Sequence, residues 1–291
     1  MNKRSLNLGL VRNENRIDVF SCHSPKMGIG HMVRSEALSS HLRALGFRVR
    51  HFRNFDQAQF EGLIPRVRVF DCPAPAKELL KLSRLQGVRT LGLDYGESPA
   101  PDVVVSVMEH GSPLPGGKRY SGFEYAIIRD EIRHYTPRKD GYVVVSLGGS
   151  DILDMGPKIA AQLSAKGEKV VLVLGPLARQ FKGQSNHLTL RNPKNFVQVL
   201  GNADWVVCNG GGTLFEAMSM EKPAYVVPQT AQEESVAAAL MGLGGLLGYG
   251  SNLPPKLTEK KKVQVASSAR NLIDGKGVNR VAEIVADLLH V

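Results

Sequence analysis

The chain has 291 residues, of which 43% are hydrophobic and 22% charged, an ordinary soluble composition with enough length for one large or two medium domains. Its charged N-terminus lacks the apolar core of a signal peptide, its most apolar stretch is too short to span a bilayer, and its three scattered cysteines fit no disulfide framework. The net charge of +10 favours an anionic partner, but the chain lacks the motifs of nucleic-acid-binding proteins. We therefore expect a cytoplasmic protein that does not bind nucleic acid.

Short β-rich runs alternate with helical segments through residues 1–135. Helices are expected at 33–45 and 76–85, and strands at 17–21, 47–52, 67–70, 88–93 and 102–107. This alternation is typical of a parallel sheet with helices on both faces. Residues 1–135 are therefore predicted to form a Rossmann-like domain.

The alternation restarts after a polar segment that contains Pro and Gly, residues 133–141, which has the composition of a linker. Helices are expected at 157–166, 194–200 and 213–220, and strands at 142–147, 170–174, 187–190, 205–208 and 224–227. A last helix, 278–289, carries an apolar stripe and is expected to dock on one of the domains. Residues 141–291 are thus predicted to form a second Rossmann-like domain.

The stretch from Cys208 to Pro228 reads as strand, glycine turn, helix and strand. Glycines bring backbone close to a ligand, and a helix start presents unpaired N–H groups and the positive end of its dipole. Together these features can hold a phosphate or diphosphate. Thr213 is expected at the helix cap, and Glu216, three residues later, suits a capping box.

Two further glycine turns follow predicted strands. One contains Gly28 and Gly30 and leads to His31, while the other contains Gly148 and Gly149. His31 could simply cap a helix or lie on the surface, but it follows the carboxyl end of the first strand, where open α/β sheets bind ligands. The simplest arrangement in which all three turns face one ligand is an α/β fold with two Rossmann-like domains facing each other across a cleft.

These motifs resemble a known group of proteins. GxGHxxR at 28–34, GGSD at 148–151 and GGGTxxEAxxxxKPAxxVP at 210–228 are similar to the GT-B superfamily of nucleotide-sugar enzymes. Within it, the chain resembles the UDP-2,4-diacetamido-2,4,6-trideoxy-altropyranose hydrolases of pseudaminic-acid synthesis and their spore-coat polysaccharide relatives. Segment 122–131 carries the most specific part of a resemblance that spans about residues 28–285.

The resemblance implies a nucleotide in the second domain and a sugar in the first. Glu216 would then bond the ribose hydroxyls instead of capping the helix. Gln229 and Gln232 are candidates near the sugar or diphosphate, or else belong to an ordinary polar loop. No Asp-x-Asp motif is present, so we expect no metal and no cofactor. The expected nucleotide and phosphate ligands are Gly28, Gly30, Gly148, Gly149, Ser150, Asn209, Gly210, Gly211, Gly212, Thr213, Glu216 and Gln232.

The first function that the resemblance implies is a metal-independent, inverting hydrolase that releases UDP from an amino-deoxy-sugar nucleotide in surface glycan biosynthesis. His31 would be the general base, and Asp71 or Asp94 would be the next candidates for that role. Two alternatives remain open. One is a GT-B glycosyltransferase that uses a UDP-sugar donor, with peripheral membrane contact if its acceptor is a lipid phosphate. The other is a nucleotide- or glycan-binding relative without turnover.

Overall fold

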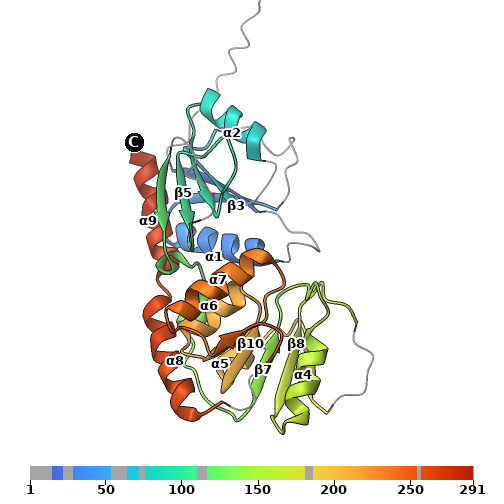
Figure 1. The fold of residues 1–291 in the computed structure, drawn as a ribbon. Helices are drawn as coiled ribbons and strands as arrows, with labels where there is room; N and C mark the ends of the chain where they lie inside the picture. Colours follow the sequence, from blue (N-terminus) through green and yellow to red (C-terminus); the bar gives the residue numbers. More distant parts are fainter. Residues whose placement is uncertain are drawn as a thin grey trace, which may run out of the picture.

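The computed structural model describes residues 15–21, 29–53, 64–71, 76–109, 117–180, 186–253 and 257–290. In these ranges the chain forms two six-stranded sheets, and each belongs to a separate lobe (Figure 1). All the strand pairs are parallel. No helix within these ranges is both long and apolar enough to cross a membrane.

The sheet of the first lobe has the strand order β2-β1-β3-β4-β5-β6. The chain runs from β1 outward to β2 and then returns to pair β3 with the other side of β1, so the topological switch point lies between β1 and β3. The strands are β1 (Arg16–Ser21), β2 (Arg48–Phe52), β3 (Val67–Asp71), β4 (Arg89–Leu93), β5 (Val103–Ser106) and β6 (Lys118–Ser121).

The sheet of the second lobe has the order β12-β11-β10-β7-β8-β9, and its switch point lies between β7 and β10. Several of its central strands are continuous apolar runs, as expected for a parallel sheet that is covered on both faces. The strands are β7 (Val143–Ser146), β8 (Val170–Leu174), β9 (Leu188–Arg191), β10 (Trp205–Cys208), β11 (Ala224–Val226) and β12 (Gly248–Tyr249).

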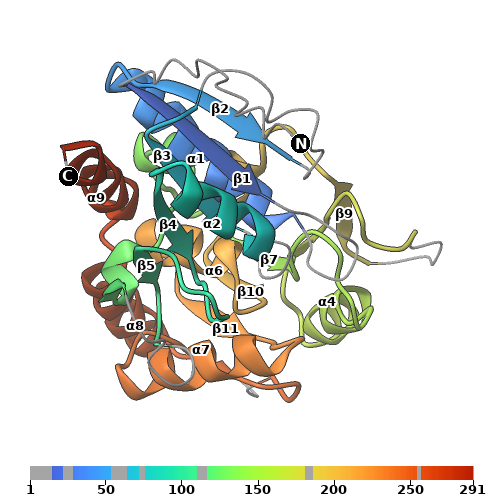
Figure 2. The ribbon, with the colours of Figure 1, turned by 90° about the horizontal axis from the view of Figure 1, so that it is seen from above.

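Helices cover both faces of the first sheet. α1 (Gly30–Ala44) and the C-terminal helix α9 (Gly277–His290) pack on one face, and α2 (Ala76–Leu85) packs on the other. Figure 2 shows α2 on the near face of the sheet and α1 beyond it. The predicted last helix therefore does dock back, and it docks on the first lobe.

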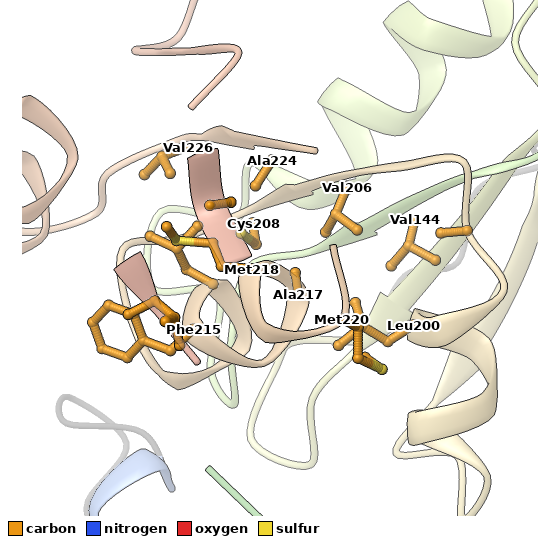
Figure 3. Packing of buried hydrophobic residues seen from close by; sticks show 14 of the residues in the cluster. Val144, Leu200, Val206, Cys208, Phe215, Ala217, Met218, Met220, Ala224 and Val226 are labelled. Carbon is orange, nitrogen blue, oxygen red and sulfur yellow. The ribbon is translucent and has the colours of Figure 1, made fainter. Parts of the chain in front are cut away.

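The segment between the lobes contains the 3₁₀ turn η2 (Phe123–Tyr125) and the short helix α3 (Asp130–Arg133). In the second lobe, α4 (Gly156–Ala165) covers one face of the sheet. The helices whose residues enter the main core on the other face are α5 (Phe196–Gly201), α6 (Gly212–Ser219), α7 (Ala231–Gly242) and α8 (Glu259–Leu272). Figure 3 shows Ala217 and Met218 of α6 beside strand residues such as Val206 and Cys208.

The predicted strands and helices are present, and most ends differ by one residue. α1 is the largest difference, because it begins at Gly30 instead of residue 33, and the N–H of Val33 already donates to the carbonyl of Ile29. The sequence analysis does not predict β6, α3, α7, α8 or β12. The expected α/β fold with two parallel sheets and a returning C-terminal helix is confirmed.

Candidate active site

A cavity of about 770 Å³ lies between the two lobes. Its lining includes residues that follow β1 and β4 in the first lobe, and β7 and β10 in the second. Small-molecule sites usually measure about 300–1,000 Å³ and lie at switch points of parallel sheets. The size and the position both indicate a ligand site, with α1 on the side of the first sheet that faces the second lobe (Figure 1).

The cavity brings the described parts of the three predicted glycine turns together. The predicted residues that line it are Gly30, His31, Asp94, Gly148, Gly149, Ser150, Asn209, Gly210, Gly211, Gly212, Thr213, Glu216, Gln229 and Gln232. Gly28 lies outside the described residues, and Asp71 lies behind His31. The roles expected for all of these residues, as nucleotide ligands or as the base, stay predictions. Within the described ranges, no group of three or more His, Cys, Asp or Glu side chains is placed to hold a metal ion.

His31 is the second residue of α1 and forms a pair with Asp71 at the end of β3. Its Nδ1 lies 2.7 Å from Oδ1 of Asp71. Because an ionised carboxylate only accepts hydrogen bonds, Nδ1 of a neutral imidazole must carry the proton, and Nε2 is then the acceptor nitrogen. His31 lines the cavity, whereas Asp71 is completely buried. The pair therefore has the geometry of a general base with an orienting carboxylate.

Arg34, on α1 like His31, also binds the carboxylate of Asp71. Its Nε donates to Oδ2 at 2.8 Å and its Nη2 donates to Oδ1 at 2.5 Å, while Nη1 donates to Asp94. Burial would raise the pKa of Asp71, but the Arg34 guanidinium and the hydrogen bonds from Arg34 and His31 hold it well below its usual range. The sequence analysis quotes Arg34 only as the last residue of the GxGHxxR motif and assigns it no role, although it lies three residues after His31 and thus on the same helical face.

The two aspartates occupy different positions in the site. Asp71 also accepts a hydrogen bond from Oγ of Ser35 at 2.8 Å. Its carboxylate is therefore bonded to His31, Arg34 and Ser35 and is buried behind the cavity lining. Asp94 lines the cavity, has a φ of +49°, and accepts from the N–H of Val107 at 3.3 Å. Of the two alternative bases, Asp94 is therefore the one with access to a ligand, and Asp71 has the position of an orienting group.

The glycine turn after β10 leads directly into α6. The cap residue is Gly211, with φ −109° and ψ −154°, and the helix begins at Gly212. The prediction that Thr213 caps the helix is wrong, because the extended Gly211 lets the helix begin before that position. Gly211, Gly212 and Thr213 all line the cavity, so the positive end of α6 faces its interior.

Glu216 does not form the capping box that its spacing suggests. Its Oε1 lies 2.6 Å from Nε of Arg129, which belongs to the segment between the lobes. Glu216 is only 3% exposed and lines the cavity, and its Oε2 has no hydrogen-bond partner in the described part of the chain. Burial raises the pKa of Glu216, and Arg129 acts in the opposite direction. That oxygen is itself buried, so only a ligand group that enters the cavity beside Glu216 can donate a hydrogen bond to it.

Glu233 at the start of α7 joins two turns beside α6. Its Oε1 accepts from Nδ2 of Asn209 at 2.6 Å, and its Oε2 accepts from the N–H of Gln229 at 2.8 Å. The side chain of Gln229 bonds the carbonyl of Leu147 at 3.3 Å and the N–H of Leu153 at 3.2 Å. Gln229 thus ties the glycine turn after β7 to the loop after β11. The sequence analysis does not single out Glu233.

Comparisons with known proteins agree with this architecture. No protein-family model matches the chain. The spore coat polysaccharide biosynthesis protein SpsG of Bacillus subtilis (strain 168) is 25% identical over 197 residues, a match that covers 58% of this chain and 58% of SpsG.

Solved structures of similar shape cover almost the whole chain. The glycotransferase of kitacinnamycin has a TM-score of 0.66 at 16% identity, covering 96% of this chain and 100% of its own. The spinosyn forosaminyltransferase SpnP has a TM-score of 0.61 at 13% identity, and the match covers 96% of this chain and 100% of SpnP. MurG of Acinetobacter baumannii has a TM-score of 0.60 at 12% identity, and the match covers 94% of this chain and 99% of MurG. These similarities show that the chain has the GT-B fold.

Proposed function

We propose that the chain is an enzyme that acts on nucleotide sugars, and specifically a GT-B glycosyltransferase that moves a sugar from a nucleoside-diphosphate donor to an acceptor hydroxyl in polysaccharide biosynthesis. One observation carries the proposal: the His31–Asp71 pair and the glycine-rich start of α6 line or adjoin the same cavity between the lobes. The sugar transferases of the same fold and the spore-coat relative support it.

The second lobe would hold the nucleotide. The N–H groups and the dipole at the start of α6 would stabilise the diphosphate, both before the reaction and as it leaves. Oε2 of Glu216 would accept hydrogen bonds from the ribose hydroxyls, because it is the unpartnered oxygen of a carboxylate in the cavity. The turn at Gly148 and Gly149 would lie against the same ligand.

The first lobe would supply the base. Nε2 of His31 takes the proton of the acceptor hydroxyl while that oxygen forms a bond to the anomeric carbon. The bond from the anomeric carbon to the diphosphate breaks on the opposite face, so the anomeric configuration inverts. Asp71 stabilises the imidazolium that forms, and Arg34 keeps Asp71 in position.

Hydrolysis is the second candidate, and it needs only water in place of the acceptor. Segment 122–131, which resembles the UDP-2,4-diacetamido-2,4,6-trideoxy-altropyranose hydrolases of pseudaminic-acid synthesis, favours it. Arg129 of this segment contacts Glu216 at the proposed nucleotide site. The substrate would then be a UDP-linked amino-deoxy sugar, and the products would be UDP and the free sugar with inverted configuration.

Nucleotide release decides between these functions. The purified protein is incubated with UDP-, CDP- and GDP-sugars, first with water alone and then with glycan or lipid-phosphate acceptors. Release that requires an acceptor supports the transferase, and release in water alone supports the hydrolase. Binding of a nucleotide sugar without turnover under either condition would point to the non-catalytic alternative. A chain that binds none of the donors would contradict the proposal.

A further inference from the structure

Arg129 links the segment between the lobes to the cavity. It precedes α3, and its Nε donates to Oε1 of Glu216, 87 positions later in the chain. Its guanidinium carbon lies 5.1 Å from the ring centre of Phe196 at the start of α5. All three side chains line the cavity, so this contact belongs to the ligand site.

The contact leaves Glu216 with one free oxygen. A buried carboxylate is costly unless a cation or hydrogen bonds compensate it, and Arg129 is the cation in contact with this one. Glu131 also faces Glu216, and its negative charge acts with burial to raise the pKa of Glu216, whereas Arg129 lowers it. Removing the Arg129 charge would therefore favour the protonated form of Glu216.

We propose that Arg129 is a positioning residue that holds the carboxylate of Glu216 through Oε1 and directs its Oε2 toward the two ribose hydroxyls of a bound ribonucleotide. An ionised carboxylate accepts from both hydroxyls of a cis-diol, whereas a protonated one loses part of its acceptor capacity. The inference rests on the proposed function, since it deepens the assignment of the nucleotide site. It makes the preference for a ribonucleotide depend on a residue outside the second sheet and its helices.

Arg133 provides a matched control. It lies on the same segment and carries the same charge, but its partner is Asp130 at 3.3 Å and it is not among the residues that line the cavity. Arg129→Met and Arg133→Met therefore remove the same group at nearby positions. The Arg129→Met/Glu216→Gln double variant removes the uncompensated buried charge and covers the case in which Arg129→Met fails to fold.

The experiment is calorimetric titration of the full chain from pH 6 to 9. The ligands are UDP, CDP and GDP, followed by the 2′,3′-dideoxy form of the one that binds tightest. For Arg129→Met we expect ribonucleotide binding at pH 7 to weaken by about tenfold to a hundredfold, the usual range for a hydrogen bond to a charged group. Affinity should recover as the pH rises and Glu216 ionises, and dideoxynucleotide binding should hardly change.

Two control variants, Arg133→Met and the double variant, separate the possible outcomes. Arg133→Met should bind like the wild type, and the double variant should show weak binding without the recovery at high pH. If Arg129→Met, or the double variant in its place, weakens both nucleotide forms equally, then Arg129 is only structural and the inference fails while the proposed function stands. If the wild type binds no nucleotide, the proposed function fails, and the inference fails with it.

Discussion

The carboxylate of Asp71 is the most fully bonded group of the site. His31, Arg34 and Ser35 all contact it, and all three belong to the first turns of α1. The bonds hold His31 in one orientation, which lowers the cost of placing the base for reaction. They also compensate a carboxylate that is completely buried. At the scale of single residues, the base and its support are thus one connected group.

The role of His31 leads to the first prediction. Replacing His31 by Asn removes the base, so turnover should fall by about a hundredfold to ten-thousandfold, the usual effect of losing a positioned base. Nucleotide affinity should change little, because the second lobe carries the predicted nucleotide ligands. Steady-state rates and calorimetry on the same preparation check both effects. Near-normal turnover, or a parallel loss of nucleotide binding, would mean that His31 is a structural residue or a phosphate ligand.

Asp71 gives a prediction about stability and pH. Its pKa in the fold lies below the value of about 3.9 for an unfolded chain, so its ionised form stabilises the fold above that pH. This contribution is lost as the pH falls below about 4 toward the folded value. In urea unfolding, the stability difference between the wild type and Asp71→Asn should therefore be largest near pH 7 and shrink below about pH 4. A difference that stays constant down to pH 3 would contradict this account.

The start of α6 is the element that would hold the diphosphate. Unpaired N–H groups and the helix dipole face the cavity there, and both attract an anion without a divalent cation. We therefore expect UDP to bind in EDTA with the same affinity as in magnesium. Calorimetry in the two buffers makes the comparison. Binding that disappears in EDTA and returns with magnesium would show that a metal is required.

Substitutions of two glycines, Gly210 just before α6 and Gly212 at its start, test stability and nucleotide binding separately. A Cβ on Gly210 would lie 2.7 Å from the carbonyl oxygen of Glu233, whereas a Cβ on Gly212 would meet nothing within 4 Å. Gly210→Ala should therefore destabilise the fold by about 1–3 kcal/mol, as overpacking usually does. Gly212→Ala should keep or slightly raise stability but weaken UDP, because its methyl group enters the cavity. Thermal unfolding and UDP titration check these outcomes, and equal stability of the two variants would contradict them.

At the scale of the whole molecule, the chain crosses between the lobes more than once. It leaves the first lobe after β6 and returns after α8, so that α9 packs beside α1. At the return, Arg280 bonds Asp274 at 2.6 and 2.8 Å and the carbonyl of Glu124 at 2.8 Å. These contacts join the two crossings. The domain limits of 1–135 and 141–291 stay a prediction.

A close approach between the lobes, at Gly149 and Ile29, provides a prediction at the same scale. A Cβ on Gly149 of the second lobe would lie 2.9 Å from Cγ1 of Ile29 and 3.1 Å from its backbone nitrogen. Gly149→Ala should push the lobes apart, so turnover should fall more than nucleotide affinity. Adding Ile29→Ala removes the side-chain part of the clash and should restore part of the rate. Unchanged turnover in Gly149→Ala would show that this approach has no role in the reaction.

Much of the fold follows from local patterns. Apolar runs of strand length alternate with helical segments, and these short-range signals predict most elements to within one residue. The glycine turns were identifiable for the same reason, since a strand, a turn and a helix are neighbours in sequence. His31 could be selected because it follows the first strand directly. The sequence analysis predicts neither α7, whose apolar residues are spread around the helix, nor α8, which is mostly polar.

The sequence by itself thus determined two α/β units, the places where their strands end, and the base candidate at one of those ends. Only the tertiary structure decided which charged groups meet. His31 and Asp71 are 40 positions apart, and Arg129 and Glu216 are 87 apart. Such pairs depend on the order of strands in each sheet and on how the lobes face each other, and neither leaves a local pattern. Long-range packing therefore assigned Glu216 to Arg129 instead of to the cap of its own helix.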